Sequence, residues 1–282
     1  MTPTQIRSSD HHSPSRYAGR LVAPRSFMVD EPPQFFMADP GRFQLYASWS
    51  SPWSHRSTLV VALAGLTDVV RVFYVETDYG IKRLRKSYQA ADPAFRGSVP
   101  VPTLWDGQTQ RVVSNDHSTI DVDLAGELRE WSTTGLELYP ADLQDEIDEL
   151  DRWLGPAVNQ GVYRALGPGG DAARARVLLQ DAFVRLDRRL AAARYLLGDR
   201  LTLADVRLWV TLVRLDPPVG GIRRIGGELA QYRSLWAYAQ DLYEQDAFQR
   251  TTDPASFAVE AGGPGPAAST AASARSTESW LR

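Results

Sequence analysis

Two adjacent serines, Ser50 and Ser51, precede Pro52 at the point where a strand pattern gives way to a helix pattern. Proline suits the first turn of a helix, so we expect a helix to begin at Pro52. Backbone N–H groups at a helix N-terminus point outward and favour an anion. A serine hydroxyl at this turn can donate a hydrogen bond to such an anion, or serve only as the N-cap. The two roles are compatible, and Ser50 competes with Ser51 for either.

The residue inventory excludes several other chemistries. The chain has no cysteine, so disulfides, thiolate nucleophiles and cysteine metal sites are excluded. Its four histidines are His11, His12, His55 and His117. They are too few and too scattered for a convincing metal site, so we expect no bound metal.

Composition and charge limit the partners of the chain. Its 282 residues are 43% hydrophobic and 23% charged, which is typical of a globular protein with a real core. The net charge of −3 argues against a nucleic-acid-binding surface, which would need a basic face. No apolar run approaches the roughly 18 residues of a membrane span. Residues 1–20 are polar and do not resemble a signal peptide, so we expect a cytoplasmic protein.

Residues 43–131 alternate strand and helix patterns. The predicted elements are a strand at 43–47, a helix from Pro52 with an apolar stripe at Leu59, Leu63 and Leu66, a strand at 69–75, a hairpin of 103–106 and 110–113 around Gly107, and a helix at 114–131. The order β-α-β, linker, β-β-α is that of thioredoxin. We therefore expect a thioredoxin-like domain here.

The second half of the chain is predicted to be helical. Apolar residues recur three to four positions apart along one stretch, as one face of a helix requires, and others mark a second helix. These residues are Leu143, Ile147, Leu150, Leu154 and Val158 in the first stretch, and Val177, Phe183, Leu186 and Leu190 in the second. A third helix is predicted after Thr202, a natural N-cap. Asp205 stands three residues on and can reach back to the Thr202 N–H, as in a capping box.

These patterns divide the chain into four parts. We predict an N-terminal extension at 1–42, the thioredoxin-like domain at 43–131, an all-helical domain at 140–257 and a tail at 258–282. The tail is rich in Ala, Gly, Ser, Thr and Pro, a composition that buries too little apolar surface to offset chain entropy. We therefore expect it to be disordered.

Several stretches of roughly residues 35–250 resemble the glutathione transferases, and more specifically their xi class, the glutathionyl-hydroquinone reductases. The resemblance lies in residues 46–56 (YASWSSPWSHR), 101–106 (VPTLWD), 113–115 (VSN), 147–150 (IDEL), 159–163 (NQGVY), 198–205 (GDRLTLAD), 205–209 (DVRLW) and 213–217 (VRLDP). It implies a thioredoxin-like N-terminal domain, a helical C-terminal domain, glutathione as cosubstrate, and a homodimer.

The sequence also departs from this family. Where the family has a cysteine that forms a mixed disulfide with glutathione, this chain has Ser51, and a hydroxyl cannot carry out thiol–disulfide exchange. The acidic residue and following serine that grip the γ-glutamyl end of glutathione are here Asp116 and His117. The segment between Glu76 and Tyr88 is shorter and lacks a tryptophan that lines the thiol site. The family's C-terminal segment with histidine and tyrosine is absent.

The resemblance implies roles for eight residues. Ser51 would donate a hydrogen bond to a bound thiolate, as in serine-type glutathione transferases. A charge-assisted bond of about 1.5–3 kcal/mol corresponds to a thiol pKa lowered by about 1–2 units. The N–H and C=O of Val101, before a cis Pro102, would hold the cysteinyl part of the thiol, with Pro100 as a competitor for the cis bond. Tyr163 would donate to an oxyanion of the electrophile. Thiol-binding roles also fall to Trp53, Ser114, Asp116 and His117.

Each of these residues also has a structural interpretation. Ser51, Ser114 and Asp116 can be ordinary helix caps, Trp53 can pack in the core, and Tyr163 can be half-buried. Three functions remain open. The chain can be a transferase that adds a small thiol, glutathione or an analogue, to a hydrophobic electrophile. It can be a thiol-dependent isomerase or tailoring enzyme. Finally, it can be a catalytically silent binding protein that kept the fold after losing the cysteine.

Overall fold

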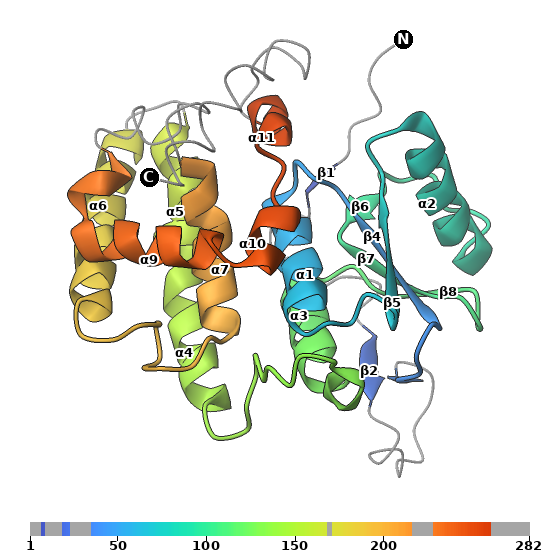
Figure 1. Cartoon of the computed structure of the whole chain (residues 1–282). Helices are drawn as coiled ribbons and strands as arrows, with labels where there is room; N and C mark the ends of the chain where they lie inside the picture. The colour runs from blue at the N-terminus through green and yellow to red at the C-terminus, as the bar shows by residue number, and fades with distance from the viewer. Residues whose placement is uncertain (1–6, 9–18, 23–34, 168–170, 216–227, 261–282) are drawn as a thin grey trace. The chain divides into compact units, whose positions relative to one another are not determined.

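The computed structural model describes residues 7–8, 19–22, 35–167, 171–215 and 228–260 (Figure 1). The chain forms two compact units, Met1–Leu138 and Tyr139–Arg282. The first combines strands and helices, and the second is helical in its described residues. No described helix is long and apolar enough to cross a membrane.

A four-stranded sheet forms the centre of the first unit. Its strands are β4 (Phe43–Ala47), β5 (Val70–Tyr74), β7 (Thr103–Asp106) and β8 (Arg111–Ser114), in the order β5-β4-β7-β8. β4 runs parallel to β5 and antiparallel to β7, and β7 is antiparallel to β8. The predicted thioredoxin-like arrangement is therefore confirmed.

Three helices cover the two faces of this sheet (Figure 1). Helix α2 (Asp78–Ala91) packs on the face that carries Tyr46, Trp105 and Val112. Helices α1 (Pro52–Leu63) and α3 (His117–Gly126) contact each other on the other face. Every residue of α1 is buried, including its polar ones.

Three sequence-based boundaries were wrong. Helix α1 ends at Leu63 because Gly65 adopts a positive φ of 64°, so the buried Leu66 lies beyond the helix. The second hairpin strand begins at Arg111, and Gln110, with φ 55°, completes the turn. The helix predicted over residues 114–131 is α3 alone, followed by a short 3-10 helix, Arg129–Trp131.

Helix α2 occupies a stretch that we interpreted only as a linker. Thr77 caps it by accepting a hydrogen bond from the Gly80 N–H at 3.1 Å. Only Gly80, Leu84, Ser87 and Tyr88 are buried in the helix, so its apolar face is narrow. This sparse stripe explains why the helix was missed.

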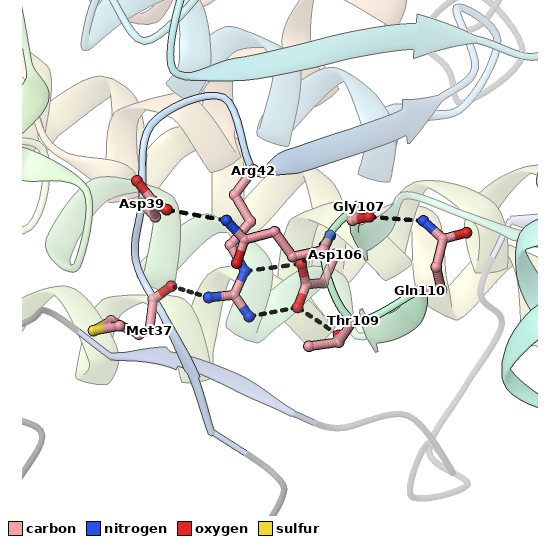
Figure 2. A network of polar contacts seen from close by, with 8 residues as sticks. Met37, Asp39, Arg42, Asp106, Gly107, Thr109 and Gln110 are labelled. Atoms are coloured by element: carbon pink, nitrogen blue, oxygen red, sulfur yellow. Dashed lines mark hydrogen bonds and ion pairs between the residues drawn. The ribbon is translucent and has the colours of Figure 1, made fainter.

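A buried ion pair joins the start of β4 to the end of β7 (Figure 2). Arg42 donates from Nε and Nη2 to the two Asp106 oxygens at 2.8 and 2.5 Å. Thr109 and the Gln108 N–H also donate to this carboxylate. Burial alone would raise the pKa of Asp106, but these hydrogen bonds outweigh it and lower the pKa. The network stabilises the register of β4 against the hairpin.

Part of the N-terminal segment is attached to this unit. β2 (Arg20–Val22) pairs in parallel with β3 (Phe35–Met37), and the Gly19 N–H donates to the Val113 carbonyl at 2.8 Å. The Asp123 carboxylate of α3 accepts from Arg20 Nε at 2.6 Å and from the Leu21 N–H at 2.7 Å. The Asp123 side chain is only 1% exposed.

The helical unit begins with an almost continuous helix. α4 (Gln144–Leu154) runs through a π-helical turn at Gly155–Asn159 into α5 (Gln160–Leu166). Long helix α6 (Asp171–Leu190) packs against α5 and contains the four residues that predicted it, of which Val177 is 56% exposed. The unit continues with α7 (Leu203–Leu212), 3-10 helices at Val213–Leu215 and Leu229–Gln231, α9 (Arg233–Tyr243), α10 (Asp246–Arg250) and α11 (Pro254–Glu260). The rest of the predicted tail, from residue 261, lies outside the described residues.

Helix α7 has the predicted capping arrangement. The Thr202 N–H donates to Asp205 Oδ2 at 2.9 Å. Asp205 Oδ1 also accepts from the Leu196 N–H at 2.9 Å and from the Tyr238 hydroxyl at 3.0 Å. This fully buried carboxylate therefore joins the start of α7 to α9 and to the preceding loop.

Asp123 predicts a pH dependence of stability. Burial raises its pKa to about 6, although Arg20 and the Leu21 N–H oppose the shift, whereas an unfolded Asp titrates near about 3.9. The folded protein therefore binds more protons between these values, so this group's contribution to the free energy of unfolding falls as pH rises from about 4 to 6. Chemical denaturation should show a decline on the order of 2 kcal/mol in the wild type relative to Asp123→Asn.

The exposed Asp68→Asn is the matched control and should retain the wild-type pH profile. An Asp123→Asn profile parallel to that of the wild type through this range would contradict the prediction.

Candidate thiol-binding site at the sheet edge

Three segments meet at one edge of the four-stranded sheet. In the β4–β7 pair Tyr46 lies opposite Thr103, and in the β7–β8 pair Leu104 lies opposite Ser114. The carboxyl ends of β4 and β8 therefore lie beside the amino end of β7. The segments at this edge are 48–51 after β4, 99–102 before β7 and 115–117 after β8. All the predicted thiol-binding residues lie in or next to these segments.

Ser51 is the N-cap of α1. Its Oγ accepts a hydrogen bond from the Ser54 N–H at 3.3 Å, and its residue is 4% exposed. A hydroxyl has one donor and two acceptor positions, so the capping bond leaves the Ser51 proton available. Ser50 instead exchanges a hydrogen bond of 2.9 Å with Ser48 Oγ. The geometry therefore favours Ser51 over Ser50 as a hydrogen-bond donor to a ligand.

The Val101–Pro102 peptide bond is cis, as the resemblance implied. A buried chain of hydrogen bonds supports this bend. Thr103 Oγ1 donates to the Pro100 carbonyl at 2.8 Å and exchanges a bond of 2.8 Å with the Tyr88 hydroxyl. Asn115 Nδ2 donates to the same hydroxyl at 2.9 Å. The Tyr88 side chain of α2 thus links the loop before β7 to the loop after β8.

Asp116 is the N-cap of α3. Its Oδ1 accepts from the Ser118 N–H at 2.9 Å and from the Ser118 hydroxyl at 2.6 Å. Its own N–H donates to Ser114 Oγ at 3.0 Å. Asp116 therefore has the capping role that the sequence allowed, whereas Ser114 is the last residue of β8 and holds the Asp116 N–H. Asp116 is partly exposed, so a ligand ammonium can still reach its carboxylate.

Trp53 and His117 bring the N-terminal turns of α1 and α3 together. Their rings stack with centroids 4.2 Å apart and planes 20° from parallel. The Arg56 guanidinium lies 4.6 Å from the Trp53 ring centroid. Trp53 is only 7% exposed, which leaves little of its ring for a ligand. The packing interpretation of Trp53 therefore has the stronger geometric support.

A second aromatic pair borders the Ser51 loop. The Trp49 ring stacks on Tyr74 with centroids 3.8 Å apart and planes 5° from parallel. The backbone N–H of Trp49 donates a hydrogen bond to the Glu76 carboxylate, and this bond holds the loop against the end of β5. Burial raises the pKa of Tyr74 to about 12, so its phenol remains neutral at physiological pH.

Tyr163 is the one predicted site residue that belongs to the second unit. It lies on α5 of the helical unit and is 45% exposed, whereas all the other predicted site residues belong to the first unit. Its role toward an electrophile remains a prediction.

Sequence reasoning missed Tyr88, Thr103 and Asn115, because only the fold brings their polar groups together.

The chemistry of this edge suits a small zwitterionic ligand. It offers two helix N-termini, a carboxylate, a serine hydroxyl and the backbone beside a cis proline. The described residues contain no group of three or more His, Asp or Glu placed to hold a metal ion.

Comparison with known proteins identifies relatives over most of the chain. Residues 170–241 match the family described as glutathione S-transferase, C-terminal domain. Glutathionyl-hydroquinone reductase YqjG of Escherichia coli is 32% identical over 243 residues, which are 77% of this chain and 74% of that protein. Glutathione S-transferase omega-like 2 of Schizosaccharomyces pombe is 32% identical over 257 residues, covering 78% of this chain and 80% of that protein.

Solved structures agree with this assignment. The glutathione-bound structure of YqjG from Escherichia coli superposes with a TM-score of 0.76 at 29% identity, covering 90% of this chain and 88% of that one. The xi glutathione S-transferase of Phanerochaete chrysosporium gives 0.75 at 27% identity, covering 88% and 90%. The chain therefore belongs to the glutathione transferase superfamily and resembles its xi class, the glutathionyl-hydroquinone reductases.

Proposed function

We propose that this protein is a glutathione transferase that binds glutathione, or another small thiol, and adds it to a hydrophobic electrophile with assistance from Ser51. The observation that carries the proposal is the convergence of Ser51, Val101 and Asp116 at one sheet edge. These residues offer a hydroxyl donor, a backbone pairing edge and a carboxylate. They match the thiol, cysteinyl amide and ammonium groups of glutathione in that order.

In this proposal the Ser51 hydroxyl donates a hydrogen bond to the sulfur and favours the thiolate. The α1 N-terminus adds favourable partial charge. The thiolate sulfur then forms a carbon–sulfur bond to the electrophile, whose electron pair moves onto an oxygen or departs with the leaving group. Tyr163 donates to that oxygen, and in an addition the thiol proton ends on the product. The working form would be a cytoplasmic homodimer.

The relatives raise the question of reductase activity. YqjG of Escherichia coli and PcpF of Sphingobium chlorophenolicum are named glutathionyl-hydroquinone reductases. Thiol–disulfide exchange needs a sulfur nucleophile, and this chain has none. We therefore propose conjugation rather than cysteine-based reduction.

A catalytically silent binding protein is the second candidate. The hydrogen bonds of Ser51 and Asp116 within their own helices favour it, because both residues have a structural role without any ligand. A thiol-dependent isomerase or tailoring enzyme would use the same thiol site. Thiol binding alone does not distinguish the silent binding protein from either kind of enzyme. Turnover of a substrate does distinguish them.

Calorimetric titration with reduced glutathione at neutral pH tests the thiol site. We expect saturable binding by the wild type. Binding should weaken by about tenfold or more in Asp116→Ala, because a charge-assisted hydrogen bond contributes about 1.5–3 kcal/mol. Ser51→Ala should weaken glutathione binding by a similar factor at a pH where glutathione binds as the thiolate. Tryptophan fluorescence provides a second readout, since Trp49 and Trp53 lie beside the site.

Asp68→Ala is the matched control for charge, because Asp68 is an exposed carboxylate in the turn between α1 and β5. It should bind glutathione like the wild type. An absence of wild-type binding up to millimolar glutathione would contradict the glutathione assignment. Binding unchanged in both site variants would place the thiol elsewhere.

Replacing Ser51 by cysteine tests whether the rest of the site is intact. The Ser51→Cys thiolate should attack the sulfur of a glutathionyl-hydroquinone, release the hydroquinone and form a mixed disulfide with glutathione. A second glutathione thiolate then resolves it as glutathione disulfide. We expect reductase activity that is absent from the wild type and from Ser50→Cys. A folded but inactive Ser51→Cys variant would support the silent binding protein.

A further inference from the structure

Strand β6, which contains Val101, already has a hydrogen-bonded partner from the start of the chain. β1 (Arg7–Ser8) pairs in parallel with β6 (Pro100–Val101). Arg7 lies opposite Pro100 and Ser8 lies opposite Val101. The pairing involves the same backbone that the proposed function assigns to the thiol.

Val101 supplies the backbone hydrogen-bond donor of strand β6. Proline has no backbone N–H, so the Val101 amide is the sole donor in the segment 100–102. One N–H makes one well-aligned hydrogen bond. Any strand or peptide that takes a hydrogen bond from this segment must therefore use the Val101 amide. β1 and the cysteinyl part of glutathione have the same requirement.

Burial reinforces this conclusion. Val101 has 0% exposure, and its side chain packs in the cluster that contains Tyr88 and Trp105. With β1 in place, a peptide-like thiol has no access to the Val101 backbone. Addition of an extended segment to a free strand edge is a general mode of peptide recognition, and here the added segment belongs to the same chain.

The N-terminal segment has a second attachment that does not involve β6. Gly19 bonds to Val113, and Arg20 and Leu21 bond to Asp123. The described residues of the two attachments do not overlap, so β1 can leave β6 while residues 19–21 stay bound. The second attachment also keeps β1 at a high effective concentration near the edge.

We propose that Arg7–Ser8 is an intramolecular competitor of the thiol, so that glutathione binds only when β1 releases Val101. This inference rests on the proposed function, because it assumes that the thiol pairs with Val101. The apparent dissociation constant then equals the intrinsic one divided by the fraction of molecules with a free edge. The proposal therefore predicts a protein whose thiol affinity is lowered by its own N-terminal segment.

Proline substitutions in the full chain test the competition. The double variant Arg7→Pro, Ser8→Pro removes both backbone N–H groups of β1. Thr2→Pro, Thr4→Pro adds the same number of prolines outside the paired residues. In calorimetry with reduced glutathione, the first variant should bind about tenfold more tightly than the wild type if β1 occupies the edge in about nine-tenths of molecules. The second variant should bind like the wild type.

Trypsin provides an independent readout in the unmodified protein. Cleavage after Arg7 requires that the segment leave β6, so glutathione should accelerate it, as followed by intact-mass spectrometry. Cleavage after Arg20 is the internal control, because Arg20 remains bonded to Asp123. Its rate should not respond to glutathione.

The outcomes separate this inference from the proposed function. Equal glutathione affinity in the wild type and both proline variants, with Arg7 cleavage insensitive to glutathione, would overturn the competition and leave the proposed function standing. Weaker binding by Arg7→Pro, Ser8→Pro would make β1 a part of the thiol site and overturn the competition. Binding by none of the three proteins would overturn both.

Discussion

The antiparallel register of β7 with its two neighbours is the constraint on which the rest of the first unit depends. Tyr46 opposite Thr103 and Leu104 opposite Ser114 bring the loop after β4, the loop before β7 and the loop after β8 to one edge. A shift of one residue would turn every side chain of β7 to the opposite face. The Arg42–Asp106 pair holds the register at the far end of β7. The Tyr88 and Thr103 hydroxyls link the loops at the near end.

The same edge explains how one residue can act in both structure and chemistry. Ser51 caps α1 as an acceptor and keeps its proton for a ligand. A cysteine at this position would supply a nucleophile, whereas serine can only orient and stabilise a sulfur that arrives with the ligand. Exchange of a cysteine sulfur for a serine oxygen at this position would therefore change the reaction that the fold can perform without changing the fold. Asp116 likewise combines a capping role with a partly exposed carboxylate that a ligand can contact.

Local patterns predicted the elements that carry strong periodicity or caps. β4 matches its predicted residues, and the bond from the Thr202 N–H to Asp205 was expected from their three-residue spacing. Helix α2 was missed because few of its residues are buried. The exposure of Val177 on α6 was not predictable either, since a helix pattern does not show how much of a helix face a neighbour covers.

The candidate site was predictable only in part. The resemblance pointed to Ser51, Val101 and Asp116, and topology explains why they meet. The hydrogen bonds of Tyr88 with Thr103 and Asn115 span 15 and 27 residues along the chain, and no local pattern predicts them. The pairing of β1 with β6 was equally invisible, because two residues are too short for a strand pattern.

We propose that Ser51 stabilises a bound thiolate. The most direct test of this proposal is a pH titration of the thiolate ultraviolet absorbance of glutathione bound to the wild type and to Ser51→Ala. We expect the bound thiol to have a pKa about 1–2 units below the roughly 8.5 of a free thiol, and most of this shift to be lost in Ser51→Ala. An unshifted pKa in the wild type, or an equal shift in both proteins, would contradict the proposal.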